Sequence, residues 1–152
     1  MYKIQLKELI RDTLVEIGCY SESAVNLLMG TAAQETHLGF YIKQLNGPAK
    51  GIFQCEPATF GDYVKNYLTY NPNLKLRIEN ACDIRNWNPE ALVYNLKFAI
   101  CMARVHYLRI SEPLPIKDAY HDMATYWKKY YNTYMGAGTT KEFIKNYKKY
   151  VL

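Results

Sequence analysis

A single carboxylate, Glu35, stands where a helical pattern ends, shortly before a compact glycine-led segment. Apolar residues recur at helical spacing from Val25 to Ala32, which predicts one buried face of a helix. Glu35 comes three residues after Ala32 and therefore lies near that face. Gly39, just beyond the pattern, is a natural stop for the helix. Residues 51–54 then read Gly-Ile-Phe-Gln, a short apolar turn that ends in an amide.

Such a position favours a protonated carboxylic acid. The last turn of a helix carries the negative end of the helix dipole, which disfavours a charged carboxylate. Partial burial by Leu38, Phe40 or Phe53 would raise the pKa of Glu35 further. A carboxylic acid that stays protonated near neutral pH can act as a general acid. On spacing alone, the plainer interpretation is favoured, in which Glu35 is a solvated residue at a helix end.

Two longer motifs extend this pattern. Residues 34–39 read Gln-Glu-Thr-His-Leu-Gly, and residues 47–60 read Gly-Pro-Ala-Lys-Gly-Ile-Phe-Gln-Cys-Glu-Pro-Ala-Thr-Phe. Together they resemble the soluble lytic transglycosylase and goose-type lysozyme superfamily, most of all the small versions encoded by bacteriophages. That family has a Glu-Ser pair at a helix end, then a Gly-Leu-Met-Gln or similar motif, then Ala-Tyr-Asn in a later helix. The spacing of all three motifs suggests that the resemblance covers the chain from about Ser21 to its end.

The resemblance assigns roles to individual residues. Glu35-Thr36 matches the first pair with Thr in place of Ser, and residues 51–54 match the second motif. Tyr131-Asn132 is the best match to the third, although Tyr130 replaces the expected Ala and the glycines that follow are displaced. Tyr126, which lies near Ala124, is the alternative to Tyr131. The resemblance therefore implies that Glu35 is catalytic and that the substrate is bound by Thr36, Phe53, Gln54, Tyr126, Tyr131 and Asn132.

The implied activity is cleavage of the β-1,4 bond between N-acetylmuramic acid and N-acetylglucosamine in peptidoglycan glycan strands, with neither cofactor nor metal. A lytic transglycosylase needs only the acid, whereas a hydrolytic glycosidase usually needs two carboxylates. The candidates for a second carboxylate are Glu56, Asp62 and Asp83, and none is singled out by spacing. Glu56 precedes Pro57, so capping of the next helix is the favoured interpretation for it. The alternatives to a transglycosylase are a lysozyme of the same fold and a non-catalytic wall-binding or virion structural module.

Length, charge and the distribution of apolar residues limit which class of protein this can be. The 152 residues fit one domain spanning 1–152, with a formal net charge of +5 and lysines concentrated near the end. No apolar run is long enough to span a membrane, and the start of the chain lacks the apolar core of a signal peptide. We therefore expect synthesis in a host cytoplasm and action on the periplasmic wall, as an endolysin or as a virion-associated enzyme with other virion proteins as partners. Nucleic-acid binding through the Tyr- and Lys-rich second half is a weaker alternative that we do not expect.

The cysteines and histidines show no metal-binding pattern. The four cysteines are widely scattered and form no Cys-x-x-Cys pair, which favours free thiols. Cys101 lies in an apolar helical run and is expected in the core, whereas Cys55 adjoins Gln54 and can line a cleft. The three histidines also lack ligand spacing, so structural or surface roles are predicted for His37, His106 and His121.

The predicted fold is mainly α, similar to the lysozyme superfamily, with a small β-hairpin or flap near 40–54. Helices are expected over about 6–17, from a Ser21 cap to Glu35, from Pro57 to Leu68, over 74–82, and over 116–134. Asn88 and Pro89 read as the cap and first residue of a long apolar helix, about 89–110, which we expect at the centre of the domain. Trp127, Tyr131 and Tyr134 share one face of the helix over 116–134, as core packing or as a sugar-binding surface. Thr139 and Glu142 form a capping-box signature for a last helix.

Overall fold

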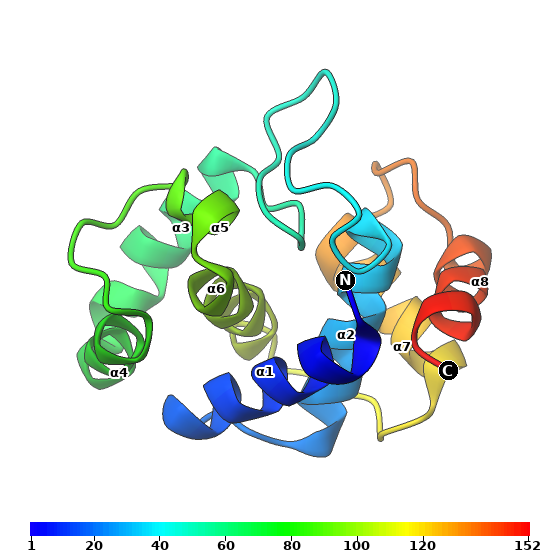
Figure 1. Cartoon of the computed structure of the whole chain (residues 1–152), viewed down its shortest axis with the longest axis horizontal. Coiled ribbons are helices and arrows are strands. Elements are labelled where there is room, and N and C mark those ends of the chain that lie inside the picture. The colour runs from blue at the N-terminus through cyan, green and yellow to red at the C-terminus, as the bar shows by residue number, and fades with distance from the viewer.

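The computed structural model describes residues 1–152 and consists of helices and loops, with no β-sheet (Figure 1). The mainly α class predicted from the sequence is confirmed. The α-helices are α1 (Lys3–Glu16), α2 (Glu22–Thr36), α3 (Pro57–Asn66), α4 (Pro72–Cys82), α5 (Ala91–Tyr94), α6 (Leu96–Leu108), α7 (Tyr120–Trp127) and α8 (Thr140–Tyr150). Two further turns complete the set: the 3₁₀-helix η1 (Leu68–Tyr70) and the π-helix η2 (Lys128–Asn132).

Capping residues in the sequence correctly predict where three helices begin. The Ser21 hydroxyl accepts a hydrogen bond from the Ala24 backbone N–H at the start of α2, as predicted. Pro57 is the first residue of α3, where its missing N–H costs nothing. At α8 both halves of the predicted capping box are present, between Thr139 and Glu142. These starts depend only on neighbouring residues, which is why the sequence is enough to find them.

The central helix is shorter than predicted, because the expected span of about 89–110 is broken at Asn95. The Asn95 carboxamide oxygen accepts from the Phe98 backbone N–H and so caps α6. Its amide nitrogen donates to the Cys82 carbonyl at the end of α4, 2.9 Å away. The residue that breaks the helix thus also ties it to α4. The helix is nevertheless central, since α6 packs against every helix from α1 to α5.

The bounds predicted for the helix over 116–134 are also wrong. It begins only at Tyr120, and after Trp127 the backbone changes from α to π geometry over η2. Thr133, with φ of 66°, ends the turn. The change of geometry alters which side chains share a face: Trp127 is fully buried, whereas Tyr134 is 87 % exposed.

Residues 40–50, which we call the flap, form a protruding loop and no β-hairpin (Figure 1). The segment makes only isolated bridges, between Lys43 and Lys50 and between Lys50 and Cys55. The predicted β-hairpin is therefore not confirmed, and the alternative of a looped flap describes the segment. The chain enters it through His37, Leu38 and Gly39, all at positive φ, so the helix stop predicted at Gly39 falls two residues earlier.

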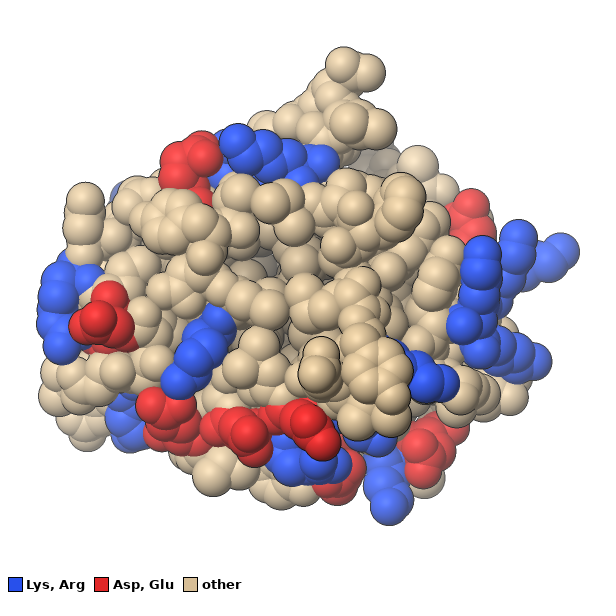
Figure 2. All heavy atoms as spheres, viewed as in Figure 1, with Lys and Arg blue, Asp and Glu red and all other residues tan.

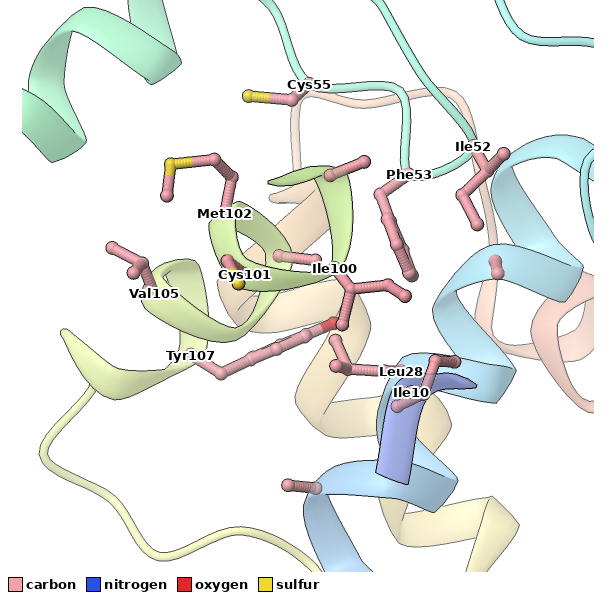
Figure 3. Close-up of a cluster of buried hydrophobic side chains, with 14 of the residues drawn as sticks. Ile10, Leu28, Ile52, Phe53, Cys55, Ile100, Cys101, Met102, Val105 and Tyr107 are labelled. Carbon is pink, nitrogen blue, oxygen red and sulfur yellow. The ribbon is translucent and has the colours of Figure 1, made fainter. Parts of the chain in front are cut away.

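The core is one continuous cluster of buried apolar residues that joins all eight helices to the turn at 51–54. Cys101 is fully buried in it, as predicted, and all four cysteines are free. Phe53 reaches from the 51–54 turn into the core between α2 and α6 (Figure 3). None of the helices has the length and apolarity that crossing a membrane requires. Charged side chains lie around the periphery, with a cluster of basic groups where α8 lies (Figure 2).

Candidate active site

A cleft of about 600 Å³ opens between the end of α2, the flap, α3 and the segment from Trp127 to Gly138. Its lining is mostly neutral and polar, and it contains no Lys or Arg. The lining residues are Gln34, Glu35, Tyr41, Gln44, Ala49, Gln54, Cys55, Glu56, Thr59, Tyr63, His106, Trp127, Tyr131, Asn132, Thr133, Gly136, Ala137 and Gly138. Of the residues predicted to form the site, the structure brings four to this cleft: Glu35, Gln54, Tyr131 and Asn132.

Glu35 lies in the last turn of α2 and is largely buried. Burial raises the pKa of Glu35 from 4.5 to about 7, although a hydrogen bond from Trp127 to the carboxylate opposes the rise. The Trp127 indole nitrogen donates to Oε1 at 3.0 Å, while Oε2 makes no hydrogen bond within the protein and is not sealed from the cleft. Glu35 is therefore partly protonated near neutral pH, with one carboxyl oxygen available to a ligand.

Trp127 contacts the Glu35 carboxylate, a role that the sequence did not identify. The pattern placed it on an aromatic face of a helix, where core packing and sugar binding remained equal interpretations. The structure gives it both a packing and a polar role, because its ring is fully buried and its indole N–H reaches Glu35. The only available signal was its shared face with Tyr131, and no spacing rule connects Trp127 with a carboxylate 92 residues earlier in the chain.

Thr36 is fully buried and absent from the cleft lining, so its side chain does not face the place where the resemblance implies a substrate contact. Its hydroxyl donates to the Ile52 carbonyl at 2.7 Å and accepts from the Gly39 backbone N–H at 2.9 Å. Both bonds join the end of α2 to the segments that follow it. The hydroxyl therefore fixes Glu35 relative to the 51–54 turn and is not available to a ligand.

The turn at 51–54 requires glycine at its first position. Gly51 has φ of 76°, and a Cβ added there would lie 2.4 Å from the Leu92 carbonyl oxygen. A side chain at this position would push the turn away from α5. The turn is closed by Gln54, whose backbone N–H and side-chain amide both donate to the Gly51 carbonyl. Gln54 thus lines the cleft with its carboxamide already oriented.

Phe53 and Tyr131 are neighbours in space but differ in role. The Phe53 ring is buried in the core and is absent from the cleft lining, so its predicted contact with substrate is wrong. Tyr131 lines the cleft, and its hydroxyl donates to the Phe53 carbonyl at 2.6 Å. The Tyr131 hydroxyl thus bonds to the 51–54 turn and makes no hydrogen bond to Glu35. Tyr131 positions that turn, while Trp127 contacts the acid.

The segment from Thr133 to Gly138, which we call the glycine loop, forms one edge of the cleft. Asn132 lines the cleft just before it, with its carboxamide oxygen held by the Lys128 ammonium at 2.6 Å. A Cβ at Gly138 would lie 2.6 Å from the Trp127 ring, so glycine is what lets the loop close over the indole. The predicted alternative, Tyr126, is buried outside the cleft and donates to the Glu112 carbonyl, so a substrate contact for it is wrong.

Among the three candidate carboxylates only Glu56 lines the cleft. It occupies the cap position of α3 but its side chain makes no capping hydrogen bond, so the favoured capping interpretation is wrong. Asp62 is paired with Arg109 and accepts a hydrogen bond from Asn66 outside the cleft. Asp83 ends α4, also outside the cleft. Glu35 and Glu56 are thus the two carboxyl groups of the cleft.

His106 forms part of the cleft wall. Its Nε2 bonds the Tyr130 carbonyl at 2.5 Å, and its Nδ1 lies 2.6 Å from the Tyr63 hydroxyl. Because a carbonyl can only accept, Nε2 carries the proton and Nδ1 accepts from Tyr63. Burial lowers the pKa of His106 to about 4, so the ring is neutral at neutral pH. The predicted structural role is consistent with this arrangement, in which His106 links α3, α6 and η2.

No group of three or more His, Cys, Asp or Glu side chains is placed to hold a metal ion. The cleft instead offers amides and hydroxyls, from three glutamines, one asparagine, two threonines and three tyrosines. Comparison of the chain with protein-family models, curated proteins and solved structures finds no match.

Proposed function

We propose that the protein cleaves the β-1,4 bond between N-acetylmuramic acid and N-acetylglucosamine in peptidoglycan, as a lytic transglycosylase of the lysozyme-like superfamily. The observation that carries the proposal is the state of Glu35: a carboxyl group with a pKa of about 7 faces a cleft lined by amides and hydroxyls. Such groups suit a neutral polyhydroxylated ligand, whereas a nucleotide or another anion would call for Lys or Arg in the lining.

The proposed mechanism begins with Glu35 as general acid. Its free oxygen, Oε2, donates a proton to the glycosidic oxygen as the bond to the muramyl C1 breaks. The positive charge that develops at C1 is relieved by the N-acetyl group of the substrate itself, so no protein nucleophile is needed. Glu35, now a carboxylate stabilised by the Trp127 N–H, takes the proton of the muramyl C6 hydroxyl. That oxygen bonds C1 and gives a 1,6-anhydro product.

The hydrolytic alternative is favoured by one observation, the presence of Glu56 in the same cleft. In a lysozyme of this fold a positioned water would attack C1, and a second carboxylate would hold that water. Glu56 makes no hydrogen bond with its side chain at the start of α3, so it is free for this task. A Glu56→Gln variant would then lose hydrolysis, whereas a transglycosylase would keep its activity.

The decisive experiment is digestion of purified Gram-negative peptidoglycan, with mass spectrometry of the soluble fragments. Fragments ending in 1,6-anhydromuramic acid would establish a transglycosylase, and reducing ends one water heavier would establish a lysozyme. Glu35→Gln is the control and should fold normally but lose activity by about 10²-fold or more. If that variant digests the wall at the wild-type rate, Glu35 is not the acid.

A non-catalytic module that binds the wall is the remaining candidate. It would bind insoluble peptidoglycan while releasing no soluble fragment. If active, the proposed enzyme would serve a bacteriophage in one of two ways: as an endolysin that degrades the periplasmic wall at the end of infection, or as a virion-associated protein that opens it locally at DNA entry.

A further inference from the structure

The two loops that border the cleft expose apolar side chains. In the flap, Phe40 is 85 % exposed and Leu45 is 81 % exposed. In the glycine loop, Tyr134 is 87 % exposed and Met135 is 80 % exposed. Large apolar groups concentrated at one place on a surface usually mark a binding site. We call these four side chains the rim.

Each half of the rim adjoins, along the chain, a residue that lines the cleft. Phe40 precedes Tyr41, which lines the cleft and donates through its hydroxyl to the Glu35 carbonyl at 2.6 Å. Tyr134 follows Thr133, another lining residue. The flap and the glycine loop rise at the same end of the molecule (Figure 1), and the protruding tip of the flap carries no charged atoms in the view of Figure 2. A ligand that leaves the cleft here therefore passes apolar side chains.

A glycan strand must leave the cleft at its edges. A cavity of about 600 Å³ has the size that encloses a small molecule, not a polymer. This step depends on the proposed function, in which the substrate is a polymeric strand of N-acetylated sugars. Sugar rings carry C–H faces that pack on aromatic rings, while a tyrosine hydroxyl remains free to bond outward.

We propose that the rim is an outer binding surface for the glycan strand, in which Phe40 and Tyr134 each cover the C–H face of a sugar residue beyond the cleft. Leu45 and Met135 extend these two faces. A lipid bilayer is a poorer occupant, because a flat surface resting on both loops would cover the opening through which the strand passes. The rim thus lengthens the site for polymeric substrate and leaves the reaction at Glu35 unchanged.

The test compares long and short substrates with a variant in which Phe40 and Tyr134 are both alanine. We expect kcat/KM on insoluble peptidoglycan to fall about tenfold, while kcat/KM on a soluble tetrasaccharide of the same repeat stays at the wild-type value. Tyr70→Ala is the matched control, because Tyr70 is 78 % exposed on η1 and is absent from the cleft lining. Equal activity of the double variant and wild type on the polymer, or an equal loss on both substrates, would overturn the proposal.

A binding measurement separates this proposal from the proposed function. In a Glu35→Gln background, sedimentation with insoluble peptidoglycan should show about tenfold weaker binding when both rim aromatics are removed. If the wild type cleaves nothing but this binding difference holds, the catalytic proposal fails and the rim proposal stands. If rim-dependent binding is found instead with vesicles of phosphatidylethanolamine and phosphatidylglycerol, the surface contacts lipid and the proposal is overturned.

Discussion

The base of the cleft and its rim are built in opposite ways. At the base, Trp127, Thr36 and His106 are buried and Glu35 is half-buried, and the polar atoms that face the protein are hydrogen bonded to it. At the rim, large apolar side chains such as Tyr134 stand in solvent on loops without regular structure. The difference suggests a division of labour, in which the base fixes the protonation and position of one acid and the rim supplies contact area. Changes that leave polar atoms of the base without a partner should therefore cost stability, and changes at the rim should not.

The largest effect on stability is expected at His106. Replacing it with Leu leaves the Tyr63 hydroxyl and the Tyr130 carbonyl unpaired, each at a cost of about 1–3 kcal/mol. Chemical denaturation should show the free energy of unfolding falling by about 2–6 kcal/mol. His106→Gln, which keeps a donor and an acceptor, should recover part of the loss, and exposed His121→Leu should change little. If His106→Leu is as stable as wild type, the hydrogen bonds at the base of the cleft do not contribute to stability as proposed.

Glu35 itself should make the protein less stable at high pH. The pKa of Glu35 rises from 4.5 to about 7 on folding, so the folded state holds the proton more tightly than the unfolded state. Stability contributed by that proton is present below pH 4.5 and is lost as pH rises to about 7 and beyond. Glu35→Gln should therefore be more stable than wild type by up to about 3 kcal/mol at pH 8, and about equal at pH 4. Thermal unfolding at both pH values checks this, and equal stability at pH 8 would place Glu35 in solvent.

Trp127→Phe removes the only hydrogen bond to the Glu35 carboxylate while keeping an aromatic ring. Because that bond favours the charged form, the pKa of Glu35 should rise above 7 by about one unit. The alkaline limb of the pH–activity profile should move upward by the same amount. Trp87→Phe is the control, since the Trp87 indole nitrogen has no hydrogen-bond partner and does not line the cleft. If the alkaline limb does not move, Trp127 does not influence the pKa of Glu35.

Thr36 should show the smallest effect. Thr36→Val keeps the shape but loses the hydroxyl that joins Ile52 and Gly39, and we expect the free energy of unfolding to fall by about 1–2 kcal/mol. Activity per folded molecule should stay near the wild-type value, because the side chain does not reach the cleft. Thr36→Ser should match wild type in both measurements. If Thr36→Val is stable but inactive, Thr36 has the substrate-binding role that the resemblance implied.

The sequence was sufficient where structure is determined by near neighbours. The cap at Ser21, Pro57 at the start of α3 and the Thr139 box were found because each depends on residues within one turn. Glu35 was found because it follows a clear apolar face, and Gln54 because its motif resembles a known family.

The sequence was insufficient where distant segments compete for the same polar groups. Asn95 breaks the central helix because it also bonds Cys82, and no periodicity reveals a partner 13 residues away. The π-turn after Trp127 moves Tyr131 and Asn132 out of α-helical register. His106 bonds the Tyr130 carbonyl within this turn. The burial of Thr36 and Phe53 likewise depends on how α2 and the 51–54 turn meet. Each of these is a tertiary contact that overrides a local preference.

The π-turn at η2 also bears on how such a site can arise. A π-turn holds one residue more than the α-helical turn it replaces, so it is equivalent to a single inserted residue. Because the widened turn absorbs the extra residue locally, removing one residue from Lys128–Asn132 would convert it to an ordinary α-helical turn and change the directions of the side chains within it. Trp127 precedes this segment and would keep its place beside Glu35, whereas Tyr131 and Asn132 lie within it. The widened turn is thus the local feature that sets how Tyr131 and Asn132 face the cleft.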